Sequence, residues 1–146
     1  MIEYSEELPD DIYERVTDLS EQGNLLLDSG DALGAVNVWR KALALLPSPK
    51  NKWEAGLWLN ASLGEAYRME GQLEEAKAYL LDALNCPDGH ANPFVLLRLG
   101  QALVDLGNES VGVDYLLRAY ILEGEEVFEE DGVQYLQLLR NRKLID

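Results

Sequence analysis

The sequence predicts an all-α protein built from three helix-turn-helix units and a final helix. A short phrase occurs three times, each time with two glycines seven residues apart: Gly23 and Gly30, Gly64 and Gly71, Gly100 and Gly107. Apolar residues around these glycines recur every three or four positions, which is the spacing of an amphipathic helix. The copies are about 40 residues apart, a period typical of stacked helical units.

In each copy, the first glycine is expected inside a helix and the second at its end. A glycine inside a helix costs up to about 1 kcal/mol relative to alanine. We expect close packing of the second helix of the copy to offset this cost, because a residue without a side chain lets another helix approach. The bulky residues expected in this contact are Trp39, Leu80 and Leu116. The second glycine precedes a polar residue, which is typical of a turn.

The connecting segments also have predicted structures. The stretch PSPKNKW is expected to open a long first helix in the second copy, with Trp53 and Trp58 on this extension. Asn92 is expected to cap the helix that begins at Pro93, because an asparagine side chain accepts from free backbone N–H groups and proline suits the first turn.

The two ends of the chain are predicted to differ. Residues 1–9 are expected to form a short irregular arm. After the third copy, apolar residues at helical spacing predict a terminal helix over about 127–142 that covers the last apolar face. The expected total is seven helices in a single domain of residues 1–146.

The charge of the chain limits its partners. It has 12 Lys and Arg residues against 27 Asp and Glu residues, which gives a formal net charge of −15 at pH 7. Such a surface repels nucleic acid and anionic membranes, so neither is expected as a partner. It favours a basic protein partner, although solubility alone also explains it. The acidic run from Glu123 to Gly132 has the same two interpretations, a solvated face or a steering surface.

Cellular location is inferred from signals that the sequence lacks. Cys86 is the single cysteine, so an intramolecular disulfide is impossible. The N-terminal stretch MIEYSEELPDD has neither the basic nor the apolar region of a signal peptide. Since no apolar run has the length of a membrane span either, we expect a cytoplasmic protein.

The three copies resemble the tetratricopeptide repeat (TPR), a family of helix-turn-helix repeats with small and large residues at set positions. The first copy, residues 16–49, carries Gly23, Leu26, Ala35, Trp39, Ala42 and Pro47. The second, residues 57–90, carries Gly64, Tyr67, Ala76, Leu80, Ala83 and Pro87. The third, residues 93–126, carries Gly100, Leu103, Gly112, Leu116, Ala119 and Gly124, the last where proline is usual. Where the family often has an aromatic residue, this chain has Leu19, Asn60 and Leu96.

The resemblance implies a right-handed superhelix whose concave surface is lined by the first helix of each copy. In the family, such surfaces bind an extended peptide or a protruding part of another protein. The residues expected on this surface are Asn24, Asp28, Trp58, Glu65, Arg68, Phe94, Gln101, Asp105 and Gln134, with Gln137 beside them. Aromatic rings next to carboxylates and amides suit a partner that brings Lys or Arg. In a second interpretation, Trp58 and Phe94 only pack between helices.

Other site types fit the sequence poorly. Repeats of this family that clamp a C-terminal carboxylate use Lys, Arg and Asn. The matching positions here are Ser20, Asn24, Leu97 and Gln101. Cys86 and His90 lack the third member of a catalytic or zinc site, and phosphate, dinucleotide and calcium motifs are absent. We expect no enzyme activity, no metal and no cofactor.

Longer strings, including LPSPKNKWEAGLW and NCPDGHANPFVLLRLGQ, resemble a group of small bacterial TPR proteins associated with toxin–immunity loci. This resemblance implies an acidic immunity protein that binds and neutralises a basic bacterial toxin. Two alternatives stay open. One is a secretion chaperone or assembly adaptor that holds an extended segment of its client. The other is a general scaffold, with self-association as one form of it.

Overall fold

The computed structural model describes residues 8–130 and 132–146, and within them it is all-helical, as the sequence predicts. Seven α-helices occur in these residues: α1 (Asp10–Asp28), α2 (Ala32–Leu45), α3 (Glu54–Met69), α4 (Leu73–Leu84), α5 (Pro93–Asp105), α6 (Glu109–Glu123) and α7 (Val133–Asn141). Short 3₁₀ helices join some of them: η2 (Lys50–Lys52), η3 (Gly89–Ala91) and η4 (Gly124–Phe128). The irregular arm expected at residues 1–9 falls largely outside the described residues.

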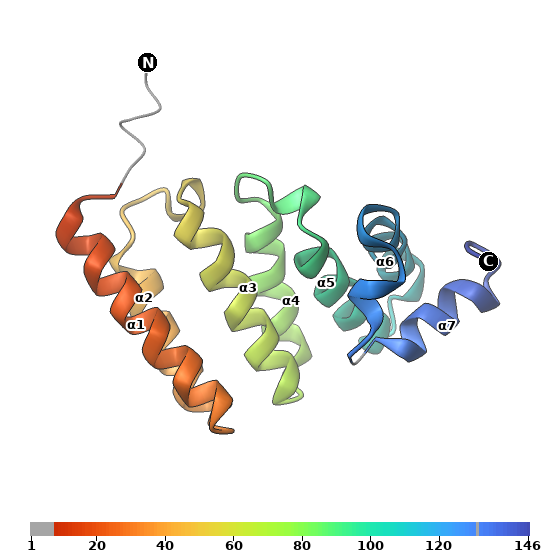
Figure 1. Ribbon diagram of the computed structural model, residues 1–146, viewed down its shortest axis with the longest axis horizontal. Coiled ribbons are helices and arrows are strands. Elements are labelled where there is room, and N and C mark those ends of the chain that lie inside the picture. Colours follow the sequence, from red (N-terminus) through yellow and green to blue (C-terminus); the bar gives the residue numbers. More distant parts are fainter. Residues whose placement is uncertain (1–7, 131) are drawn as a thin grey trace, which may run out of the picture.

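The helices follow one another in a row from α1 to α7 (Figure 1). The most extensive contacts lie within the pairs α1 and α2, α3 and α4, and α5 and α6, and contacts of α2 with α3 and of α4 with α5 join successive pairs. Additional contacts of α1 with α3 and of α3 with α5 place these three helices side by side. Helices α1, α3 and α5 therefore share one face of the row, which we call the odd-helix face.

A glycine-to-bulky-residue contact holds each pair together. It joins Gly23 to Trp39, Gly64 to Leu80, and Gly100 to Leu116. A Cβ atom added at Gly64 would lie 2.5 Å from Leu80 Cγ, and one added at Gly100 would lie 2.7 Å from Leu116 Cγ. Neither distance leaves room for a methyl group. The expected reason for the first glycine of each copy is therefore confirmed.

The second glycine of each copy ends a helix, also as expected. Gly30, Gly71 and Gly107 have φ values of 93°, 76° and 94°, in the left-handed region that glycine adopts without steric cost. The residue after each glycine donates its N–H to a carbonyl five positions earlier, as in the bond from Gln72 N to Tyr67 O at 2.9 Å. This is the Schellman ending of a helix, and it leaves the chain free to reverse.

The second pair begins differently from the sequence expectation. PSPKNKW does not extend α3: it forms a connection that includes η2, and α3 starts only at Glu54. Trp53 precedes the helix with an extended backbone, at ψ 143°. Pro47 and Pro49 explain the difference, because a proline lacks the N–H for a helical hydrogen bond and restricts the residue before it. Trp58 does lie within α3.

The last helix is also shorter than expected. Gly124 has a φ of 75° and ends α6, after which η4 carries the chain to Phe128. As a result, α7 begins at Val133 rather than near residue 127. Leu136 and Leu139 of this helix are buried, as the apolar spacing predicts.

The cap at the third pair is confirmed. Asn92 Oδ1 accepts from the backbone N of Val95 at 3.1 Å, and Pro93 occupies the first turn of α5. None of the helices in the described part of the chain is long and apolar enough to cross a lipid bilayer.

Candidate functional site

The residues predicted to bind a partner lie on α1, α3, α5 and α7, and their exposure divides them into two groups. The exposed ones are Asn24, Asp28, Trp58, Phe94, Asp105 and Gln134. The others, Glu65, Arg68 and Gln101, are half-buried or buried and belong to a network of polar contacts. Apart from Asp105, which accepts a hydrogen bond from Tyr135, the residues of the first group are accessible to a partner without rearrangement.

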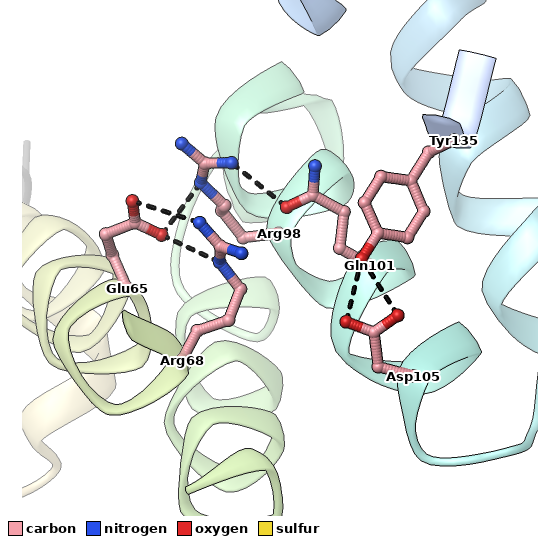
Figure 2. Close-up of polar contacts among 6 residues, drawn as sticks. All are labelled: Glu65, Arg68, Arg98, Gln101, Asp105 and Tyr135. Atoms are coloured by element: carbon pink, nitrogen blue, oxygen red, sulfur yellow. Dashed lines mark hydrogen bonds and ion pairs between the residues drawn. The ribbon is translucent and has the colours of Figure 1, made fainter. Parts of the chain in front are cut away.

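The polar network joins α3 to α5. Glu65 of α3 accepts from Arg68 Nε at 3.1 Å and also pairs with Arg98 Nε of α5 at 2.8 Å. Arg98 Nη1 in turn donates to Gln101 Oε1 at 3.0 Å. Figure 2 shows these four side chains converging from the two helices. We call them the α3–α5 network.

The burial of this network indicates a structural role. The side chains of Glu65 and Arg98 are only 17% and 8% exposed. Removing one partner from a buried ion pair leaves an uncompensated charge, so the helices are held together by the pair once it has formed. Gln101 is completely buried, and its Nε2 has no hydrogen-bond partner among the described residues. Gln101 was expected on the partner-binding surface, but its side chain is buried and accepts a hydrogen bond from Arg98.

A second contact joins α5 to α7. The hydroxyl of Tyr135 donates to the Asp105 carboxylate, with distances of 2.7 and 2.8 Å to its two oxygens (Figure 2). Burial of the ring, followed by the hydrogen bond to Asp105, raises the pKa of Tyr135 to about 12. The phenol thus stays protonated and keeps donating at neutral pH. Asp105, predicted as a binding residue, already has a partner within the chain.

An open pocket of about 650 Å³ lies between α1 and the start of α3. We call it the N-terminal pocket. Its aromatic side chains are Tyr13 and Trp58, 60% and 39% exposed, and the buried Trp53. Val16, which is 2% exposed, also lines the pocket. Asn24, another predicted residue, also lines this pocket.

The charged side chains of this pocket have one sign. Among its described lining residues, the charged ones are Asp10 and Glu21 of α1 and Glu54 of α3, and none is Lys, Arg or His. All three carboxylates belong to exposed residues. The pocket therefore combines aromatic surface with negative charge.

Phe94 lies in a different environment. Its ring is 39% exposed and has the Arg98 guanidinium 5.1 Å from its centroid. It borders a smaller hollow of about 300 Å³, together with Glu123 and Glu126. Gln134 is exposed on α7, and Gln137 donates to Asn141 Oδ1 at 2.9 Å. These residues do not join the N-terminal pocket.

Sequence reasoning missed Arg98, Tyr135 and Tyr13. Arg98 had a signal, because it is the single charge in the apolar run PFVLLRLGQALV. Such a residue must find a partner when its helix is buried. Tyr13 had none, because the pocket that it lines depends on how the PSPKNKW connection turns.

Cys86 and His90, considered above for a catalytic or zinc site, differ in their exposure. Cys86 is buried, its Sγ donates to Asp82 O at 3.4 Å, and burial raises the pKa of the thiol. A raised pKa lowers the share of the nucleophilic thiolate at neutral pH. His90 is exposed on η3. Within residues 8–130 and 132–146, no three side chains of His, Cys, Asp or Glu gather in a way that could hold a metal ion.

A comparison with models of known protein families finds no match for this chain, and a search of curated proteins finds none either.

Proposed function

We propose that this chain is a non-enzymatic protein-binding module of the TPR type, with its three helix pairs wound into the right-handed superhelix of that family. The glycine-to-bulky-residue contact and the Schellman turn support this proposal, because both recur in each pair at equivalent positions. Equal contacts within equal pairs are what a repeat architecture requires. The odd-helix face is then the concave, partner-binding side.

The observation that carries the binding function is the N-terminal pocket on this face. Exposed aromatic rings such as Tyr13 and Trp58 are costly to leave in water and are typical of binding hot spots. The carboxylates around them attract a basic surface. A formal net charge of −15 adds long-range attraction, which raises the rate of encounter with such a partner.

In its most concrete form, the proposal is an acidic immunity protein that binds and neutralises a basic bacterial toxin in the cytoplasm. The resemblance of the sequence to small bacterial TPR proteins and the acidic charge both support it. A secretion chaperone or adaptor is the second candidate. The size of the N-terminal pocket favours it, since about 650 Å³ accommodates side chains of an extended segment.

Affinity capture with matched baits tests the proposal. The wild-type chain and the variant Trp58→Ala are immobilised, exposed to lysate of the native cell, and washed at low and then at high salt. We expect the wild type to retain one basic, folded protein at near one-to-one ratio and the variant to lose it. Equal capture by both baits, or no enrichment of basic proteins, would contradict binding at this face.

The captured protein then separates the two candidates. An immunity protein requires the folded partner and abolishes its activity when the two are mixed. A chaperone binds an unfolded segment of the partner as tightly as the whole protein. The first result supports toxin neutralisation, and the second supports the chaperone.

A further inference from the structure

We propose that the N-terminal pocket binds an arginine side chain carried on an extended segment of the protein partner. This inference rests on the proposed protein-binding function and adds the chemistry of the partner at one place on the odd-helix face. Three properties of the pocket support this inference: its aromatic surface, its charge and its size.

The aromatic surface suits a planar cation. Tyr13 comes from α1 and Trp58 from α3, so their exposed rings belong to the two helices that border the pocket. Trp53 is held in place because its Nε1 donates to Pro47 O at 2.8 Å. A guanidinium group stacks on such rings and is attracted by their electron-rich faces.

A lysine of the chain itself illustrates this attraction. Lys52 Nζ lies 4.5 Å from the centroid of the Trp53 ring. Lys52 is not among the described lining residues, and the charged residues among them are all carboxylates. A positive charge from a partner is thus favourable inside the pocket.

The carboxylates select a cation and reject other partners. Asp10, Glu21 and Glu54 supply three carboxylates for the N–H groups of a guanidinium, which forms two parallel hydrogen bonds with a carboxylate. A phosphate or nucleic acid is repelled by them. A purely apolar helix would bury them without partners, which is costly.

Size and edge polarity favour an extended segment over a free amino acid. A pocket of about 650 Å³ lies within the range of sites that hold drug-sized ligands, so it has space beyond one side chain. Ser20 Oγ is engaged with Val16 O at 2.6 Å, whereas Asn24 at the pocket edge is exposed. An asparagine amide both donates and accepts, so it suits the backbone on either side of the arginine.

Calorimetry with matched peptides tests the preference for arginine. The probe is an acetylated and amidated five-residue peptide, Ala-Gly-Arg-Gly-Ala, and the control carries citrulline, a neutral isostere, in place of arginine. We expect saturable one-to-one binding of the arginine peptide to the full chain and binding at least about tenfold weaker for citrulline. A lysine version should bind with intermediate affinity, because it has the charge without the planar group. Equal affinities for arginine and citrulline, or no saturable binding, would overturn the proposal.

Variants locate the binding. Trp58→Leu should weaken the arginine peptide about tenfold, which corresponds to about 1.4 kcal/mol. Phe94→Leu is the matched control, because Phe94 is also 39% exposed but lies outside the pocket. The double variant Glu21→Gln/Glu54→Gln keeps the shape of the pocket and should also weaken binding, with a smaller dependence on salt. The proposal fails if Phe94→Leu has the larger effect or if both Trp58→Leu and the double variant bind normally.

The outcomes separate this inference from the proposed function. If the native partner is captured and is lost with Trp58→Ala, but the arginine peptide does not bind, the odd-helix face binds a partner by other chemistry. If capture also fails, both proposals fail. Thermal unfolding of each variant checks that the loss of binding does not reflect loss of the fold.

Discussion

The space between α1 and α3 and the space between α3 and α5 are filled in opposite ways. Between α1 and α3, the N-terminal pocket stays open, and its described lining residues bring carboxylates without a base. Between α3 and α5, the Glu65 carboxylate is paired with Arg68 and Arg98 and is mostly withdrawn from solvent. Helix pairs of the same construction thus leave one junction open, where we propose that a partner binds, and close the next with their own cations.

This difference explains why an acidic residue on this face does not by itself indicate a binding site. Glu65 and Glu54 both lie on α3, about three turns apart, yet only Glu54 lines the pocket. Glu65 already has two guanidinium groups, so a basic partner gains little from it. Arg68 and Arg98 of the chain itself thus occupy the place at Glu65 that the positive charge of a partner could otherwise take.

The largest expected effect comes from breaking the α3–α5 network. Arg98→Met should lower the free energy of unfolding by about 3 kcal/mol, because it removes a buried charge from its partner. Urea denaturation measures the change. Arg118→Met is the control, since its pair with Asp114 is 46% and 60% exposed and should contribute less than about 1 kcal/mol. Equal losses in the two variants would show that the network is no more than a surface pair.

The next largest effect on the free energy of unfolding is expected at the junction of α5 and α7, at alkaline pH. The pKa of Tyr135 is raised from 10.0 to about 12 in the folded chain, so folding favours the protonated phenol. Its contribution to stability is therefore complete below pH 10 and is lost as the pH rises through 12. With about 1.4 kcal/mol per pKa unit, the loss amounts to about 2 to 3 kcal/mol.

Comparison with Tyr135→Phe isolates this group. The difference in unfolding free energy between wild type and variant should shrink as the pH rises from 10 to 12, whereas other alkaline titrations affect both proteins alike. Chemical denaturation at several pH values measures it. A difference that stays constant over this range would mean that Tyr135 titrates normally.

A somewhat smaller effect is expected from a change within α3, which borders both junctions. Gly64→Ala places a methyl group 2.5 Å from Leu80 Cγ, so it should cost about 1 to 3 kcal/mol even though alanine favours the helix. Thermal unfolding measures the loss. Adding Leu80→Val, which removes a methylene group from the contact, should recover part of the loss. An independent, additive effect of the second change would argue against this contact as the cause.

The smallest effect on stability is expected in the pocket itself. Glu21→Gln/Glu54→Gln should change the free energy of unfolding by less than about 0.5 kcal/mol for each residue, because both are exposed. Urea denaturation of this double variant measures the change in unfolding free energy, in parallel with the same measurement on Arg98→Met. A large loss of stability would show that the pocket carboxylates hold the fold, as Glu65 does, and would remove the contrast between the two junctions.

Much of the fold could be predicted because its signals are local. The paired glycines fix the turns through positive φ at Gly30, Gly71 and Gly107, and they fix the close packing through Gly23, Gly64 and Gly100. Asn92 likewise caps α5 by accepting a hydrogen bond from the backbone N–H of Val95, three residues further along the chain. Such effects depend on the neighbours of a residue in the sequence or on the next helix, so the pattern reveals them.

The site was less predictable because it depends on contacts between helices that are distant in the sequence. Helical spacing placed Gln101 and Glu65 on the correct helices but did not reveal that Arg98 covers and binds them. The pocket depends on the turn before Trp53, where two prolines change the path of the chain. These features follow from packing rather than from periodicity.

The most direct test of the contrast between the two junctions is an NMR titration with the arginine peptide. The chain has three tryptophans, so each indole N–H gives its own signal, assigned by single replacements with phenylalanine. We expect saturable shifts for Trp58 and Trp53, which line the pocket, and none for Trp39, which is buried against Gly23. The side-chain N–H signals of Arg98 should stay unchanged. Shifts at Arg98 without shifts at Trp58, or no shifts at all, would contradict a pocket that is open to a cation beside a junction that is closed to it.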